Sequence, residues 1–361
     1  MRKAFLLVIF IIVFSCKDTK KNAVSFYFWR TKFALSPKEE KTLSDNKVTK
    51  LYVRYFDVAL QNNIPFPVKP IHFEKKLVQQ KIIPTVFIKN EVFLSKNTDI
   101  EKLSSNILKL INQINSVHKI PNSEIQIDCD WSLESRDNYM RFLKLLKVKY
   151  GKTLSATIRL HQIKYFEKTK VPPVDYGVLM LYNIGTVNAK GEKAIYDKEI
   201  ALQYLPYLEK YPLKIKTALP VFSWLVHTRK GQVIQIISKK NINDYQNKII
   251  FDVDYPKHVV TQSGIAFGDF YKEGDILFEE TISPDDIEEM KTLIHKYSKH
   301  VQTEFIYYDL DQKNLNKHKK ANQFLGIRHK LFDFKFHGGR TKVNVFKNQL
   351  ARQKKKKKKL K

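Results

Sequence analysis

The stretch EIQIDCDWS, residues 124–132, decides our interpretation of this chain. Its two isoleucines alternate with polar residues, which predicts a β-strand that ends in Asp128, Asp130 and Trp131. The two aspartates are two positions apart, so their side chains leave the same face of the strand. Like charges held that close raise at least one pKa, which places a proton donor beside an anion near neutral pH. The alternative is a pair of solvated aspartates where a strand runs into a loop.

Eight strand-like runs follow one another along the chain. They cover residues 24–29, 50–57, 82–88, the run from 124, 153–159, 176–182, 214–221 and 304–309. Helical segments are expected at 99–117, at 135–149 and from Pro284 onward, and a long insertion at about 222–283 separates the seventh and eighth strands. Alternating strands and helices predict parallel βαβ units, and eight of them predict an α/β fold of the (β/α)8, or TIM-barrel, type over residues 24–317. An open doubly wound sheet is the alternative, but no Gly-rich phosphate loop follows an early strand.

The N-terminal segment resembles a secretory signal with a lipobox. Two basic residues precede an apolar run at 4–14, and a small residue stands directly before Cys16. We therefore expect a signal peptide at 1–15, lipidation of Cys16, a short leader at 16–23, and a lipid-anchored protein of the bacterial cell envelope, in the outer membrane or at the cell surface. An ordinary cleaved signal or an uncleaved anchor is the alternative. The other cysteine, Cys129, points away from the two aspartates and is expected to be a packed thiol.

The formal net charge of +29 raises the question of a nucleic-acid partner. Much of this charge lies in the segment 318–361, which finishes in a lysine run at 354–359 and is expected to be disordered at its end. The remaining lysines are scattered, and no helix-turn-helix, zinc finger or RNP-type motif is present. We expect no specific nucleic-acid partner. The tail could instead attract anionic lipid or polysaccharide.

In a barrel, the C-terminal ends of the strands meet around one mouth. The side chains expected there are polar and aromatic: Trp29, Arg30, Asp57, Lys89, Asp128, Asp130, Trp131, Arg159, His161, Tyr182, Asn183, Trp224 and Asp309. Sugars bind such a mixture, because their apolar faces stack on aromatic rings while their hydroxyl groups pair with carboxylates, amides and guanidinium groups. Hydrolysis of a glycosidic bond needs two carboxyl groups beside that bond. Arg54 and Asp57 would lie on opposite faces of a regular strand, so we expect at most one of them at the mouth.

Two short motifs resemble the chitinase-type glycoside hydrolases of family eighteen. Residues 128–131 (DCDW) match the family's D-x-D-W-E strand end, and residues 180–183 (MLYN) match its Met-x-Tyr-Asp element. The resemblance implies that Asp130 orients an acetamido group with Asp128 as its partner, and that Tyr182 supports it. Ser132 stands where the family has its acidic Glu, and Asn183 where it has Asp. The chain as a whole also resembles uncharacterised bacterial lipoproteins with hydrolase-like barrels.

Two functions follow from these residues. The first is acid-assisted hydrolysis of a glycan, with Asp128 and Asp130 as catalytic residues and with Asp57, Trp131, Arg159, His161, Tyr182, Asn183 and Trp224 binding the substrate. The second is a non-catalytic carbohydrate-binding protein, which Ser132 favours. Several binding residues also have a structural alternative. His161 could cap its strand, and Arg159 could pair with Asp128 or Asp57. Tyr182 and Trp224 could pack into the barrel without contacting a sugar. No cofactor is expected, and no spacing supports a metal site, although Asp128, Asp130 and His161 could converge.

Overall fold

The computed structural model describes residues 22–74, 79–245, 248–300 and 302–317. The predicted signal peptide, Cys16 and the basic segment 318–361 lie outside the described residues.

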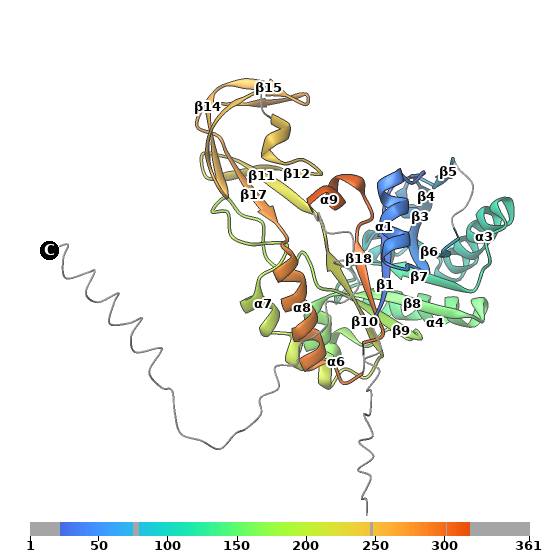
Figure 1. The fold of residues 1–361 in the computed structure, drawn as a ribbon. Helices are drawn as coiled ribbons and strands as arrows, with labels where there is room; N and C mark the ends of the chain where they lie inside the picture. The colour runs from blue at the N-terminus through green and yellow to red at the C-terminus, as the bar shows by residue number, and fades with distance from the viewer. Residues whose placement is uncertain (1–21, 75–78, 246–247, 301, 318–361) are drawn as a thin grey trace, which may run out of the picture. The chain divides into compact units, whose positions relative to one another are not determined.

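Eight parallel strands close into a barrel, as predicted (Figure 1). In spatial order they are β1 (Ala23–Phe28), β18 (Glu304–Tyr308), β10 (Ile215–Pro220), β9 (Tyr176–Met180), β8 (Thr153–Ile158), β7 (Glu124–Asp128), β6 (Lys81–Ile88) and β3 (Lys50–Gln61). The pairing of β1 with β3 completes the ring. All eight strand-like runs of the sequence become these barrel strands, which confirms the (β/α)8 fold.

Helices follow most of the barrel strands. They are α1 (Pro37–Asp45), α2 (Glu91–Leu94), α3 (Ile100–His118), α4 (Arg136–Tyr150), α5 (Leu160–Lys164), α6 (Phe166–Thr169), α7 (Lys198–Leu202), α8 (Pro284–Tyr297) and α9 (Gln312–Lys317), with a 3-10 helix, η1 (Leu205–Glu209), after α7. Local sequence fixes their starts. Asp99 accepts hydrogen bonds from two backbone N–H groups of the first turn of α3, and Ser283 forms a capping box with Asp286 ahead of Pro284 in α8.

Two small additions extend the barrel wall at β3. The second half of this long strand pairs antiparallel with β4 (Ile64–Val68). Farther on, β5 (His72–Phe73) pairs with β2 (Lys32–Phe33), which follows β1.

The insertion between β10 and β18 forms a sheet of its own, drawn in yellow to orange in Figure 1. Its antiparallel order is β12 (Gln232–Ser238), β11 (Ser223–Arg229), β17 (Ile276–Thr281), β14 (Lys257–Gln262) and β13 (Ile250–Asp254). A hairpin of β15 (Gly264–Ala266) and β16 (Asp269–Tyr271) and a 3-10 helix, η2 (Ile242–Tyr245), complete it. A separate apolar core that includes Leu225, Tyr245, Tyr271 and Leu277 holds this sheet together.

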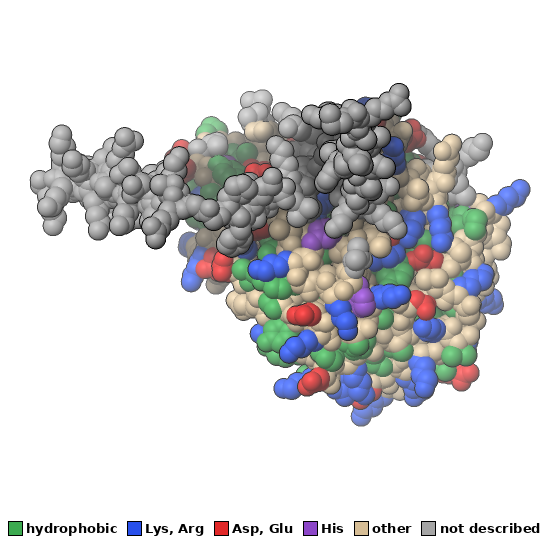
Figure 2. Space-filling model, turned by 60° about the horizontal axis from the view of Figure 1, so that its bottom comes forward, with side chains coloured by type: hydrophobic (Ala, Val, Ile, Leu, Met, Phe, Trp, Pro, Cys, Tyr) green, Lys and Arg blue, Asp and Glu red, His purple; other side chains and the backbone are tan. Residues whose placement is uncertain are grey.

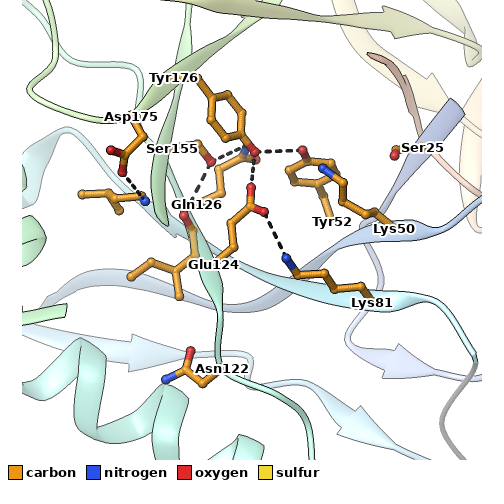
Figure 3. A network of polar contacts seen from close by, with 12 residues as sticks. Ser25, Lys50, Tyr52, Lys81, Asn122, Glu124, Gln126, Ser155, Asp175 and Tyr176 are labelled. Atoms are coloured by element: carbon orange, nitrogen blue, oxygen red, sulfur yellow. Dashed lines mark hydrogen bonds and ion pairs between the residues drawn. The ribbon is translucent and has the colours of Figure 1, made fainter. Parts of the chain in front are cut away.

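The barrel interior is polar at the end where the strands begin (Figure 3). Tyr176 donates a hydrogen bond to the buried Glu124, its hydroxyl lies 2.9 Å from that of Tyr52, and Lys81 lies 3.7 Å from Glu124. A second buried carboxylate, Glu304, accepts a hydrogen bond from Ser25 and pairs with two lysines. Buried charges persist only when they are paired and hydrogen-bonded, so these contacts fix the base of the barrel below the mouth.

Candidate functional site

Asp128 ends strand β7 at the inner wall of the barrel mouth. The hydroxyl group of Thr157, on the neighbouring strand β8, donates a hydrogen bond of 2.6 Å to its Oδ1. Burial raises the pKa of Asp128 from 3.8 to about 6, and the negative charges of Asp130 and Asp57 act in the same direction. The Thr157 hydrogen bond and the positive charge of Arg159 oppose the rise without cancelling it. Asp128 can therefore hold a proton close to neutral pH.

Asp130 is exposed and belongs to an ion pair. The guanidinium group of Arg159 contacts both of its oxygens, with Nε 2.6 Å from Oδ1 and Nη2 3.0 Å from Oδ2. The expected partners of Arg159 were Asp128 or Asp57, and the structure corrects this. The register of β7 and β8 pairs Ile127 with Ala156, so Asp130 and Arg159 each lie three residues beyond paired positions.

Asp57 is also held by an arginine. Arg54 donates from Nε to Asp57 Oδ1 at 2.7 Å, and its Nη2 lies 2.6 Å from Oδ2. The expectation that these two side chains lie on opposite faces is wrong. The register of β3 against β6 shifts between Arg54 and Phe56, and this bulge turns the two side chains toward each other.

Aromatic rings line the mouth on the side of β1, β9 and β18. Tyr182 stacks on Tyr308 with 5.1 Å between ring centroids. The ring of Trp29 also packs against Tyr308, with 5.6 Å between centroids. Phe222 meets the rings of Tyr182 and Tyr308 edge-on. We call Trp29, Tyr182, Phe222 and Tyr308 the aromatic wall. Sequence reasoning found Tyr182 and Trp29 but missed Phe222 and Tyr308.

The aromatic wall shows how a strand end can be misassigned by one position. We chose Asp309 as the last residue of the eighth strand. The inward-facing series on this strand runs from Glu304 in steps of two, which places Tyr308 inside the mouth. Asp309 is buried beyond it, where Asn314 donates a hydrogen bond of 2.6 Å to its carboxylate. The alternation from Glu304 was the signal that would have identified Tyr308.

Two predicted tryptophans do not reach the mouth as exposed platforms. Trp131 is 4% exposed and stacks on Tyr139 of α4 with 4.9 Å between ring centroids, because alternation turns it away from the face that bears Asp130. Trp224 is 7% exposed, and its Nε1 donates a hydrogen bond of 2.9 Å to Glu280. Trp224 still touches Phe222, so it supports the aromatic wall from behind. Cys129 is buried, as predicted.

The other predicted residues lie at the rim. His161 lies in the first turn of α5, where partial desolvation of the ring and the charge of Arg159 lower its pKa, against the influence of Asp130. Asn183 is exposed with a φ of 53°, a left-handed conformation that asparagine tolerates. Among the described residues, no group of three or more His, Cys, Asp or Glu side chains could hold a metal ion.

Ser132 lies two residues after Asp130, beyond the end of β7. Its backbone N–H donates a hydrogen bond of 2.9 Å to the hydroxyl of Ser135. Glu134 is exposed, and a hydrogen bond to the Ser132 side chain lowers its pKa. The Glu134 carboxylate thus reaches Ser132, but this contact favours the ionised form of Glu134, which cannot donate a proton.

Charged side chains of both signs cover the described part of the face in Figure 2. On the face drawn in Figure 2, Lys and Arg side chains are interspersed with Asp and Glu and do not gather into one continuous patch.

Within the described ranges, none of the helices combines the length and the apolar character needed to cross a membrane.

No protein-family model and no curated protein matches the chain. Solved structures do. The spore cortex-lytic enzyme SleL of Bacillus cereus is 17% identical, with 86% of this chain and 76% of that chain covered and a TM-score of 0.52. A mutant plant class V chitinase from Cycas revoluta, solved with (GlcNAc)3, is 11% identical, with 84% of this chain and all of that chain covered and a TM-score of 0.52. The chain therefore has the fold of chitinase-type, glycoside-hydrolase-like barrels.

Proposed function

We propose that the barrel mouth binds a glycan and cleaves a glycosidic bond, with Asp128 as the proton donor. The observation that carries this proposal is the contrast between two carboxyl groups at the end of β7. Burial raises the pKa of Asp128 to about 6, whereas Asp130 is exposed and the Arg159 guanidinium group contacts both of its oxygens. A carboxyl group that can hold a proton near neutral pH is suited to act as a general acid.

The two carboxyl groups suit the charge changes of glycoside hydrolysis. The leaving oxygen needs a proton, and the sugar ring develops positive charge as the bond breaks. Asp128 supplies the proton from the inner wall. Asp130 lies two residues farther along the strand, which is about 7 Å, and its negative charge orients the substrate and stabilises the cationic ring.

The aromatic wall supplies the apolar contact that a sugar needs. Half-buried Trp29 and Tyr308 present ring surface between β1 and β18, next to the hydrogen-bonding groups of Asp128 and Arg159. The Cycas revoluta barrel with the same fold was solved with (GlcNAc)3, which supports N-acetylated oligosaccharides as the first substrates to test.

The test is product release from a panel of oligosaccharides by the soluble chain from residue 17 onward. We expect Asp128→Asn and Asp130→Asn to abolish release. The control is Asp137→Asn, because Asp137 is an exposed ion-paired carboxylate on α4, away from strand β7. Unchanged hydrolysis by Asp128→Asn would remove the assignment of the acid.

A specific observation favours a second function, glycan binding without cleavage. Ser132 replaces a carboxylic acid at the outer end of the strand, and neighbouring Glu134 is stabilised as an anion. A binding protein predicts saturable retention of an oligosaccharide with no product at any pH. In that case Asp128→Asn would keep the affinity within about twofold, since a neutral amide makes similar hydrogen bonds.

We further propose that the protein is anchored in the bacterial cell envelope through a lipid on Cys16. The support is the sequence pattern of a basic start, a short apolar run and a small residue before that cysteine. Labelling of cells with an alkyne fatty acid should mark the wild-type protein and fail to mark Cys16→Ser. Label retained by Cys16→Ser would refute the anchor.

A further inference from the structure

A cavity of about 630 Å³ lies beside the barrel mouth. Three segments that are distant in sequence line it: the end of β1 with Arg30, the insertion with Lys239 and Lys240, and the chain after β18 with Asp311 and Lys313. Most of the lining is polar or charged, which distinguishes this cavity from an apolar core void.

The cavity adjoins the aromatic wall through the covalent chain. Arg30 directly follows Trp29, and Ser223, another lining residue, directly follows Phe222. The lining of the cavity and the aromatic wall are thus built from consecutive residues of the chain at two places.

Some charged groups in the lining are already neutralised. The Lys239 ammonium group forms ion pairs with the two acids that follow β18, at 2.7 Å from Asp311 and 3.6 Å from Asp309. Asp244 accepts the backbone N–H of Asn241 at 2.9 Å. The backbone hydrogen bond leaves Asp244 negatively charged, so the lining holds two acidic side chains, Asp244 and Asp311, against four basic ones, Arg30, Lys239, Lys240 and Lys313.

Two lysines of the lining have no carboxylate partner among the described residues, unlike Arg30. Within the described part of the chain, neither Lys240 nor Lys313 forms an ion pair, and Lys240 is held 3.4 Å from the centroid of the Phe267 ring. Arg30 pairs through Nη2 with Glu39 at 2.9 Å, while its buried Nε has no hydrogen-bond partner among these residues.

We propose that this cavity is a subsite for a sugar that bears a carboxylate, and that the glycan is acidic. The inference rests on the proposed glycan-binding function and narrows its substrate class. Lys240 of the insertion and Lys313 of the chain after β18 pair with the carboxylate, and the Asn, Gln and Ser side chains of the lining bind the sugar hydroxyl groups.

The experiment measures the affinity of the full chain for matched tetrasaccharides by calorimetry. One probe alternates N-acetylglucosamine with N-acetylmuramic acid, and its partner carries the same lactyl groups as neutral methyl amides. A second acidic probe alternates N-acetylglucosamine with glucuronic acid, and chitotetraose is the neutral reference. The two acidic probes distinguish a lactyl from a uronic carboxylate, and preference for either supports the inference.

We expect an acidic tetrasaccharide to bind about tenfold more tightly than its neutral partner, and Lys240→Gln or Lys313→Gln to abolish this preference. Lys248→Gln is the matched control, because Lys248 also lies over the Phe267 ring, at 3.8 Å, but does not line the cavity. The basic C-terminal segment is common to all variants and cannot produce a difference between them.

Two results overturn the inference. One is equal affinity for acidic and neutral tetrasaccharides, and the other is equal loss of affinity in Lys240→Gln and Lys248→Gln. If chitotetraose binds under these conditions, only the acidic subsite fails. If no probe binds, the proposed function fails together with the subsite.

Discussion

Asp128→Asn should stabilise this protein at pH 8 and leave its stability nearly unchanged at pH 4. The pKa of Asp128 is raised from 3.8 to about 6, chiefly by burial. Between these two values the folded protein binds more protons than the unfolded chain, so its stability falls as the pH rises through this window. Above pH 6 the protein holds an anion that folding disfavours. A neutral amide removes that penalty.

The expected size follows from the same numbers. A pKa moved from 3.8 to about 6 corresponds to about 3 kcal/mol at 1.36 kcal/mol per pKa unit. This is an upper value, because Asp128 is only half-buried and Asn must find acceptors for its two N–H groups. The Thr157 hydroxyl can still donate to the amide oxygen. We therefore expect a gain of about 1–3 kcal/mol at pH 8.

Urea unfolding followed by circular dichroism at both pH values provides the measurement. Asp137→Asn is a control of opposite sign, because Arg136 and Lys170 lower the pKa of Asp137 and its charge stabilises the protein at pH 8. If Asp128→Asn destabilises the protein at pH 8, or shifts stability equally at both pH values, then Asp128 is not a carboxyl group held in an unfavourable environment. The proposed proton donor would lose its physical basis.

Three further predictions concern the groups around the mouth and below it. Thr157→Val removes the hydrogen bond to Asp128 and should raise its pKa above 6 by about one unit, as read from carbon-13 NMR of the carboxyl group; a fall or no change contradicts the assigned contact. Arg159→Met removes the positive charge that lowers this pKa, so the same titration should also move upward, and a downward shift argues against that coupling. Glu304→Gln should destabilise the protein by about 3 kcal/mol at pH 7, because burial opposes ionisation of this carboxyl but Lys216 and Lys50 outweigh it and lower its pKa. In urea unfolding this difference should shrink as the pH falls through the lowered pKa, and a pH-independent difference would contradict the ion pair.

The barrel was predictable from the sequence because its strands carry their own signals. The apolar positions of a buried strand alternate or run continuously over a short stretch, and the intervening helices show helical spacing, so the element order follows from periodicity alone. Alternation also placed Asp128 and Asp130 on one face and Cys129 on the other. Applied two residues farther, it would have placed Trp131 away from the mouth, where the structure has it.

Other features have no local signal. The bulge that turns Arg54 toward Asp57 depends on the register of β3 against β6, which no single strand specifies. The partner of Arg159 depends on how β7 and β8 align across the barrel. The polar cavity depends on three segments that meet only after the barrel closes and the insertion folds on its own core. Such contacts between distant residues are products of tertiary structure.

The carboxyl groups at the mouth differ in their contacts with arginine. Asp57 and Asp130 each receive two nitrogen contacts from one guanidinium group. The negative charges of Asp57 and Asp130 both raise the pKa of Asp128. The hydroxyl group of Thr157 donates a hydrogen bond to Asp128. The proposed hydrolysis therefore does not need a carboxylic acid at position 132, where this chain has serine. It needs a substrate that reaches Asp128 past the Arg159 side chain, and the Asp128→Asn product assay separates an enzyme from a receptor.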